Sequence, residues 1–274
     1  VKFLTLMTLA NKLACLKRII SGYKSCLIAF SGGQDSALLL KICSLVLAKD
    51  KFLAVTAVSQ TYPLAELAKA KKLANNIGVK IKVIRTAELD NKKFSDNSPL
   101  RCYFCKQELF SKLILIAKRN KLNFVIDASN ISDITDYRPG NIAKNELGIK
   151  SPLLEAGLNK QDMRKLSKNL GLLSWNKPSL ACLASRIPYG TKITVGLLKR
   201  IDQAEAYLVS LGFKVVRLRH YNGLCRIEVD KKEIPRLINK RQAIVSKLKK
   251  LGYNYITLDL EGYRTGSLNE VIKK

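Results

Sequence analysis

The stretch Cys26-Leu-Ile-Ala-Phe-Ser31-Gly-Gly-Gln-Asp-Ser36 decides the fold of this chain. Its first five residues are apolar and predict a buried strand, and the apolar run over residues 36–47 predicts a helix. The two glycines between them let backbone N–H groups approach an oxyanion at the positive end of that helix. A Walker A loop is excluded because no Gly-Lys-Ser/Thr follows. The alternative is an ordinary glycine-rich turn in which a serine caps the helix.

This turn predicts a phosphate site with an attached cation. We expect the phosphates to contact the loop through Ser31, Gly32, Gly33 and Ser36. Asp35 can hold Mg²⁺ that bridges the phosphates, because hard cations prefer carboxylate oxygens.

Strand and helix patterns alternate on both sides of this turn. Strands are predicted over residues 52–58, 79–84 and 123–127, with helices over 64–77, 109–120 and 159–170. Strands that alternate with helices form βαβ crossovers and a parallel sheet. Residues 1–172 therefore predict an α/β, Rossmann-like domain.

The order of elements changes after residue 172. Residues 173–190 contain two prolines and a glycine, which indicates a linker. Helices are then predicted over 194–211 and 232–251, and strands over 213–219, 224–229 and 253–260. This α-β-β-α-β order predicts a small α+β domain over residues 191–274, suited to substrate binding or self-association into a homo-oligomer.

Composition narrows the class of protein. The 274 residues include 49 Lys+Arg and 21 Asp+Glu, a net charge of +28, and 47% are hydrophobic. The apolar share excludes disorder, and no uncharged apolar run is long enough to span a membrane. The charge could indicate nucleic acid, but the lysines are spread along the chain, so we expect them to be mainly solvated and nucleic acid not to be a partner.

The seven cysteines predict a reducing, cytoplasmic setting. An odd number without regular spacing is unlike a secreted disulfide scaffold. The apolar residues 3–10 are followed by Lys12, Lys17 and Arg18, so we interpret this start as an amphipathic helix and not as a signal peptide.

The loop resembles that of the PP-loop ATP pyrophosphatases, which split ATP between the α- and β-phosphates. Further segments are similar, in order and spacing, to the ATP-dependent sacrificial sulfur transferases (LarE-like) that mature the nickel-pincer cofactor of lactate racemase. The resemblance runs from about residue 9 to the C-terminus, and its segments are residues 55–63, 101–106, 136–140, 151–157, 177–190, 226–229 and 258–264.

The resemblance implies a transferase with an adenine nucleotide alpha hydrolase-like fold that uses ATP and Mg²⁺. It would adenylylate a carboxylate of a pyridinium dicarboxylate mononucleotide, and a cysteine thiolate would then attack and give up its sulfur. Cys182 matches the sulfur-donating position, and Lys177 and Arg186 flank it and would favour the thiolate. The alternative is that Cys182 is a small buried residue.

Other side chains are candidates for nucleotide or substrate contacts. Nucleotide contacts are expected from Thr56, Ser129, Arg138 and Arg186, although residues 127–130 depart from the family's Asp-Gly-Thr-Asn. Arg217 and Arg219 alternate on one predicted strand, so both point to one face, where they suit a phosphorylated or dicarboxylate substrate. Glu205 matches an acidic family position that serves proton transfer or metal contact. The alternative for Arg186 and Glu205 is a solvated charge, and for Arg217 and Arg219 it is an exposed strand face.

Cys102-x-x-Cys105 has two interpretations. It is a loop with structural thiols, or it contributes to a [4Fe–4S] cluster that is held by three cysteines and has an open iron with an extra sulfide. Cys182 would be one ligand of that cluster, and Cys225 or the pair Cys102 and Cys105 are candidates for the others. A zinc site is a poor fit because His220 is the only histidine. Cys15, Cys26 and Cys43 lie in apolar patterns and are expected in the core.

Three alternative functions remain open from the sequence. The first is tRNA thiolation, which would use the positive charge. The second is an ammonia-using ligase similar to NAD synthetase or to amidotransferases, which needs no cysteine. The third is a nucleotide-binding module that only senses ATP or AMP.

Overall fold

The computed structural model describes residues 7–133, 139–177, 181–264 and 266–271. Within these residues the chain forms two compact units. The N-terminal unit comes from residues 1–59, 64–88 and 100–180, and the C-terminal unit from residues 60–63, 89–99 and 181–274.

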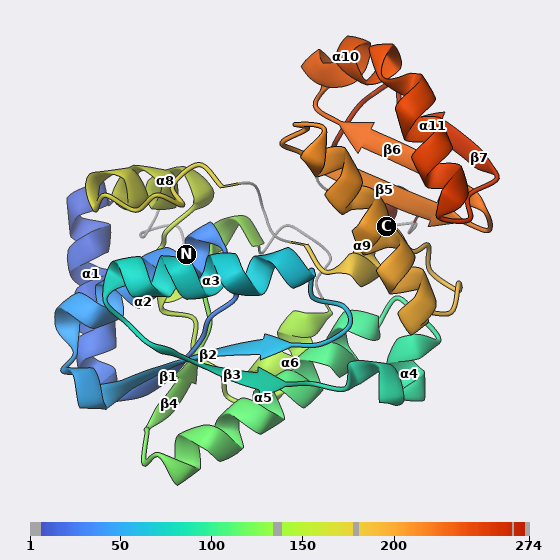
Figure 1. Cartoon of the computed structure of the whole chain (residues 1–274). Helices are drawn as coiled ribbons and strands as arrows, with labels where there is room; N and C mark the ends of the chain where they lie inside the picture. The colour runs from blue at the N-terminus through green and yellow to red at the C-terminus, as the bar shows by residue number, and fades with distance from the viewer. Residues whose placement is uncertain (1–6, 134–138, 178–180, 265, 272–274) are drawn as a thin grey trace. The chain divides into compact units, whose positions relative to one another are not determined.

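The N-terminal unit is built on a parallel sheet with the strand order β3-β2-β1-β4 (Figure 1). Its strands are β1 (Cys26–Ala29), β2 (Phe52–Val58), β3 (Ile81–Arg85) and β4 (Phe124–Ile126). Strand β1 is paired on both edges, with β2 and β4. Such a strand is covered on both faces, which explains its continuous apolar sequence. The predicted α/β class is confirmed.

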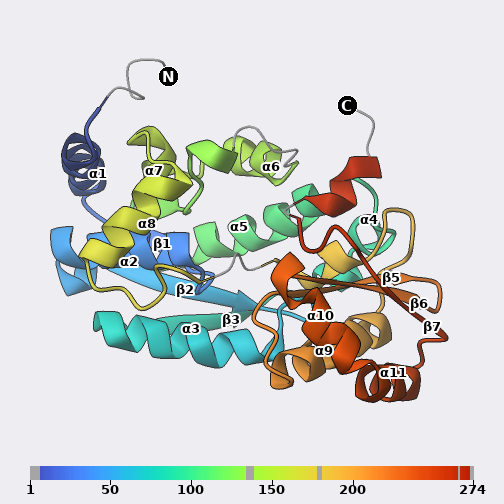
Figure 2. The ribbon, with the colours of Figure 1, turned by 90° about the horizontal axis from the view of Figure 1, so that it is seen from above.

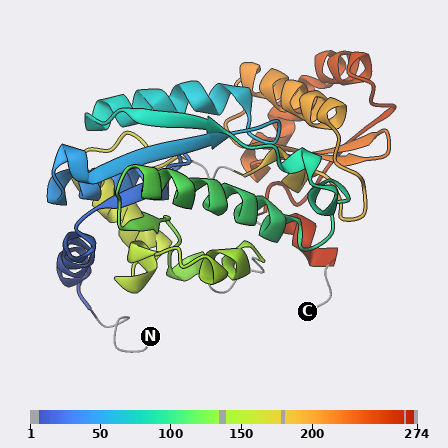
Figure 3. The same ribbon diagram turned by 90° about the horizontal axis from the view of Figure 1, so that it is seen from below.

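Helices cover the two faces of this sheet. They are α1 (Leu9–Tyr23), α2 (Gln34–Val46), α3 (Leu64–Ile77), α5 (Arg101–Arg119), α6 (Gly140–Glu146), α7 (Pro152–Glu155) and α8 (Lys160–Asn169). Cys26 and Ile28 of β1 pack in one core with α1, α2, α3 and α8, and α2 contacts α1, α3 and α8 (Figure 2). Leu27 faces the opposite core, which α5 covers (Figure 3).

The C-terminal unit has the predicted α-β-β-α-β order, with one helix divided. It contains α9 (Val195–Ser210), β5 (Val216–Tyr221), β6 (Leu224–Val229), α10 (Ile234–Asn239), α11 (Arg241–Lys250) and β7 (Tyr255–Leu258). The expected helix over residues 232–251 is interrupted at Lys240. Strand β6 lies in the middle of the sheet, antiparallel to β5 and parallel to β7.

Two short segments from early in the chain complete the C-terminal unit. The second, residues 89–99, contains helix α4 (Lys92–Ser95) and the buried Asn97. The Nδ2 atom of Asn97 donates to the carbonyls of Pro188 and Thr191 at 2.7 and 2.8 Å. In the first segment, the Thr61 carbonyl accepts from the Leu183 N–H at 2.9 Å. These contacts give the compact units different boundaries from the predicted domains 1–172, 173–190 and 191–274.

Candidate functional site

The loop between β1 and α2 depends on a glycine at residue 32. Gly32 has φ +74°, a conformation that residues with a Cβ rarely adopt. A Cβ added there would lie 2.6 Å from the Cβ of Ala70 in α3. The glycine therefore permits both the turn and the close approach of α3. Gly33 follows as the N-cap of α2.

Hydroxyl groups fix the shape of this loop. The Oγ atoms of Ser31 and Ser36 lie 3.1 Å apart, and Ser31 Oγ accepts from the Gly33 N–H at 3.3 Å. Ser36 Oγ also lies 3.1 Å from the Gly33 carbonyl, to which it donates. Thr56 is fully buried, and its hydroxyl donates to the Phe30 carbonyl at 2.8 Å. This contact gives Thr56 a positioning role at the entry to the loop.

A pocket of about 330 Å³ opens at the first turn of α2. The first N–H groups of a helix have no intrahelical acceptor, so those of Gln34, Asp35 and Ser36 can bind an anion. Cationic side chains from distant parts of the sequence also line the pocket: Lys106, Lys160, Arg164 and Lys177. A pocket with this lining suits a polyphosphate.

Carboxylates share the pocket with these cations. Asp35 Oδ2 lies 2.5 Å from Lys160 Nζ, and Asp127 and Asp133 also belong to the wall. Asp127 is held by hydroxyl donors, because Ser129 Oγ and Ser151 Oγ each lie 2.6 Å from one of its oxygens. Oxygen ligands beside a phosphate site are what Mg²⁺ prefers, so these residues fit the predicted ion.

Lys177 contacts the loop between β1 and α2. Its Nζ donates to the Gly32 carbonyl at 3.2 Å and to Glu66 Oε2 at 2.8 Å. Lys69 binds the other oxygen of Glu66 at 2.8 Å. Burial alone would raise the pKa of Glu66, but the bonds from Lys177 and Lys69 outweigh it and lower the pKa below its usual value. Glu66 is thus a charged anchor for Lys177.

Gln34, the variable position of the loop, holds a buried polar group in the pocket wall. The residue is 9% exposed, and its Nε2 atom is buried without a hydrogen-bond partner among the described residues. An apolar side chain at this first helical position would avoid that cost. The pocket wall therefore contains an amide nitrogen that no described residue satisfies.

Cys182 is exposed, and its backbone is firmly held. It is the N-cap of a 3₁₀ helix over Leu183–Arg186. Its carbonyl accepts from the N–H of Ser185 at 2.9 Å, from Ser185 Oγ at 2.7 Å and from Arg186 Nη1 at 3.0 Å. The exposure excludes the buried alternative for this cysteine.

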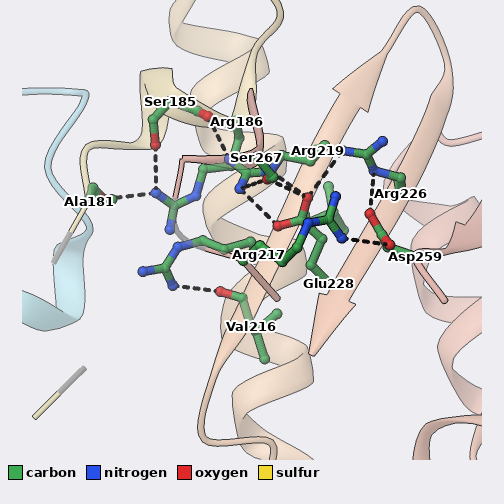
Figure 4. Close-up of polar contacts among 12 residues, drawn as sticks. Ala181, Ser185, Arg186, Val216, Arg217, Arg219, Arg226, Glu228, Asp259 and Ser267 are labelled. Atoms are coloured by element: carbon green, nitrogen blue, oxygen red, sulfur yellow. Dashed lines mark hydrogen bonds and ion pairs between the residues drawn. The ribbon is translucent and has the colours of Figure 1, made fainter. Parts of the chain in front are cut away.

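Arg186 is committed to protein groups of the C-terminal unit. It is 2% exposed, and its Nε and Nη2 each donate to one oxygen of Glu205 at 2.9 Å. Its Nη1 also donates to the Ala181 carbonyl at 2.9 Å (Figure 4). Glu205 Oε1 accepts in addition from the Leu218 N–H at 2.9 Å. These contacts give Arg186 and Glu205 positioning roles, whereas their expected phosphate, metal or substrate contacts stay predictions.

Arg217 and Arg219 lie on the same face of β5, as strand alternation predicts. Arg219 is buried and binds both oxygens of the fully buried Glu228, at 2.9 and 2.8 Å (Figure 4). Arg217 lies 5.1 Å from the centre of the Tyr263 ring. Its pKa is lowered, first by burial and then by the positive charge of Arg186. A bound anion would stabilise the charged form of Arg217 and raise its pKa again.

The remaining expectations concern cysteines and one arginine. Arg138 lies outside the described residues. All seven cysteines lie within them and are thiols. Cys26 and Cys43 are buried as expected, and Cys15 is half-buried against the same core.

The donors proposed for an iron–sulfur cluster do not fit one. Cys102 is exposed and Cys105 half-buried on the first turn of α5. Cys225 is fully buried, and burial raises its pKa to about 12, which opposes the thiolate that iron requires. Among the described residues no three Cys, His, Asp or Glu side chains gather closely enough to hold a metal through protein ligands alone, as the cluster would require. The expected iron–sulfur cluster is therefore not supported by the structure.

Sequence reasoning did not name several residues of this pocket. Lys106 follows the Cys102-x-x-Cys105 motif on α5, and Lys160 and Arg164 lie one helical turn apart on α8. The four-residue spacing of Lys160 and Arg164 was a usable signal that both face one side. No local pattern indicates that α8 meets the first turn of α2.

Comparisons with known proteins identify the family of this chain. The family model described as NAD synthase matches residues 12–121, which include the loop. The chain is 38% identical to the pyridinium-3,5-bisthiocarboxylic acid mononucleotide synthase of Lactiplantibacillus plantarum, over 97% of both chains. The chain belongs to the LarE-like family of the PP-loop superfamily.

Other relatives carry no assigned activity. An uncharacterized protein of Synechocystis sp. is 41% identical over 97% of this chain and 100% of its own length. An uncharacterized protein of Methanocaldococcus jannaschii is 31% identical over 88% of this chain and 92% of its own. As a LarE-like protein the chain is an enzyme, an ATP-using sulfur transferase. None of the described helices is long and apolar enough to cross a membrane.

Proposed function

We propose that this LarE-like enzyme converts a carboxylate of a pyridinium dicarboxylate mononucleotide into a thiocarboxylate, with Cys182 as nucleophile and sulfur donor. Two things support the proposal. The first is the name of the Lactiplantibacillus plantarum relative. The second is the presence of a cation-lined pocket in the N-terminal unit and of an exposed cysteine in the C-terminal unit. The observation that carries it is the exposed Cys182 on a backbone fixed by Arg186 and Ser185. The product would be used in the cytoplasm for the biosynthesis of the nickel-pincer cofactor of a lactate racemase.

The first step activates the carboxylate with ATP. The substrate carboxylate attacks the α-phosphate, forms an acyl-adenylate and releases pyrophosphate. The N–H groups at the start of α2 and the cations Lys106, Lys160 and Arg164 would hold the triphosphate. Asp35, with Asp127 or Asp133, would hold Mg²⁺, which supplies positive charge against the phosphates.

The second step transfers sulfur. The Cys182 thiolate attacks the activated carbonyl, and AMP leaves, so that a thioester joins the substrate to the protein. Removal of the Cα proton of Cys182 then breaks its Cβ–Sγ bond. The sulfur leaves with the substrate as a thiocarboxylate, and dehydroalanine remains in the chain.

The C-terminal unit offers a site for the substrate's phosphate or second carboxylate. Arg217 is the candidate, because its charge is opposed by burial and by Arg186, and guanidinium groups bind such anions in a fork geometry. Arg219 would help indirectly, since its ion pair with Glu228 orders the same strand face.

Pyrophosphate release tests this function. The native chain should release pyrophosphate from ATP only when pyridinium-3,5-dicarboxylate mononucleotide is present, with one thiocarboxylate formed per chain. Cys182→Ala should keep pyrophosphate release and lose the thiocarboxylate. Cys102→Ala is the matched control, since Cys102 is also exposed. A Cys182→Ala variant that forms an amide with added ammonia would support the ligase alternative instead.

A further inference from the structure

The backbone carbonyl of Cys182 has more donors than a ground-state carbonyl needs. Three of them surround its oxygen at 2.7, 2.9 and 3.0 Å: Ser185 Oγ, the Ser185 N–H and Arg186 Nη1. A carbonyl oxygen has two lone pairs, and here one of three donors also carries a positive charge. This arrangement is better suited to an oxygen that gains negative charge.

Buried ion pairs hold both donor residues in place. Arg186 is clamped by Glu205 through two bonds of 2.9 Å. The carbonyl of Ser185 accepts from Arg219 Nη1 at 2.8 Å, and Glu228 holds Arg219 in turn (Figure 4). Since these supports are buried, the donors are fixed before any reaction begins, as electrostatic catalysis requires.

We propose that Ser185 and Arg186 form an oxyanion hole for an enolate of Cys182, which makes them catalytic residues of the elimination step. The inference rests on the proposed function. A base from solvent takes the Cα proton of the thioester-bearing Cys182, and the electron pair moves onto its carbonyl oxygen. When the carbonyl reforms, Cα=Cβ forms, Cβ–Sγ breaks, and the thiocarboxylate leaves with the electron pair.

The distances fit this role. Donors of an oxyanion hole lie about 2.7–3.1 Å from the oxygen that gains charge, and removal of one donor slows its reaction by about 10²–10³-fold. The acyl-transfer step does not place charge on this oxygen. The two steps should therefore respond differently to the loss of a donor.

Ser185→Ala separates the steps, because it removes the Oγ donor and keeps the Ser185 N–H and the Arg186 guanidinium. It also removes the Oγ acceptor of a 3.1 Å bond from Arg186 Nη1, which keeps its bonds to the carbonyls of Ala181 and Cys182. With ATP and pyridinium-3,5-dicarboxylate mononucleotide, mass spectrometry of the whole chain should show the thioester adduct forming within twofold of the native rate. Conversion of the adduct to dehydroalanine should be at least tenfold slower, so the adduct accumulates. Ser210→Ala is a matched control, because Ser210 Oγ donates to the carbonyl three residues earlier at 2.7 Å.

A second experiment needs no substrate. Dinitrophenylation of the exposed Cys102 and Cys182 gives both a good leaving group, and dehydroalanine formation at pH 9 is followed by peptide mass spectrometry. The native chain should eliminate at least tenfold faster at Cys182 than at Cys102, and Ser185→Ala should reduce that ratio at least threefold.

The outcomes distinguish the two ideas. Equal elimination at the two labelled cysteines, or a ratio that Ser185→Ala leaves unchanged, contradicts the oxyanion hole. An equal slowing of adduct formation and elimination by Ser185→Ala contradicts it as well. If the native chain forms neither the thioester adduct nor dehydroalanine at Cys182, the proposed function fails, while the dinitrophenyl experiment still decides on the oxyanion hole.

Discussion

Arg186 and Glu205 form a two-bond ion pair in which Nε–Oε1 and Nη2–Oε2 are both 2.9 Å. Their side chains are only 3% and 13% exposed. The pair joins the 3₁₀ helix that follows Cys182 to helix α9. It therefore couples the orientation of the reactive segment to the core of the C-terminal unit.

Glu205→Ala should destabilise the C-terminal unit by about 3–5 kcal/mol, because it leaves the Arg186 charge buried without its carboxylate. Thermal unfolding followed by circular dichroism measures the effect. Glu233→Ala is the control, since Glu233 pairs with Arg236 at 3.0 Å on an exposed helix turn and should cost less than about 1 kcal/mol. Equal losses from the two variants would contradict the positioning role of Glu205.

Gly32→Ala should impair both folding and nucleotide binding. It combines an unfavourable φ with a Cβ contact of 2.6 Å to Ala70. Gly78→Ala isolates the first factor, because Gly78 has φ +85° and no atom within 4 Å of an added Cβ. The control should cost about 1–2 kcal/mol, and Gly32→Ala clearly more. Urea unfolding measures the loss of stability, and titration calorimetry with ATP measures the loss of binding. Equal losses of stability in the two variants would contradict the steric role assigned to Ala70 of α3.

Gln34→Leu should raise the stability of the N-terminal unit, because the buried Nε2 has no partner among the described residues. An unsatisfied buried amide costs about 1–3 kcal/mol. Gln203→Leu, an exposed position on α9, should leave stability within about 0.5 kcal/mol. The melting temperatures of the two variants check this, and a lower value for Gln34→Leu would refute it.

His220 should make stability fall as the solution is acidified. Its pKa lies below 6.5 in the fold, first because of burial and then because of the positive charge of Arg200. The unfolded chain therefore takes up the proton first, so stability is complete above pH 6.5 and declines as pH falls toward the folded pKa. As the only histidine, it gives a single imidazole NMR titration. A midpoint above 6.5 would reverse the sign.

Sequence patterns predicted the local features of the fold but not the contacts between residues that are distant in the sequence. The loop at residues 31–36 and the shared face of Arg217 and Arg219 follow from local spacing. The acid that neutralises Arg219 does not, because Glu228 lies on the neighbouring strand β6, where the pairing with β5 places it opposite Arg217 and within reach of Arg219. Likewise, nothing local predicts that Asn97 anchors residues 188–191.

The same limit applies to the site. Cys182 stood out through its segment, but the donors around its carbonyl depend on a 3₁₀ turn and on the partly buried Glu205. The family resemblance suggested ligands for phosphate and metal at Arg186 and Glu205, where the structure has an internal ion pair. The contacts of these two residues with a ligand stay predictions, and their role in holding the Cys182 segment is seen only in the structure.

Peptide mass spectrometry of the chain after a single turnover tests the central claim most directly. The native chain is incubated with ATP, Mg²⁺ and pyridinium-3,5-dicarboxylate mononucleotide, and the peptide that carries Cys182 is weighed. If Cys182 gives up its sulfur, this peptide loses one H₂S, about 34 Da, in proportion to the thiocarboxylate formed. Product formation with an unchanged Cys182 peptide would contradict the account.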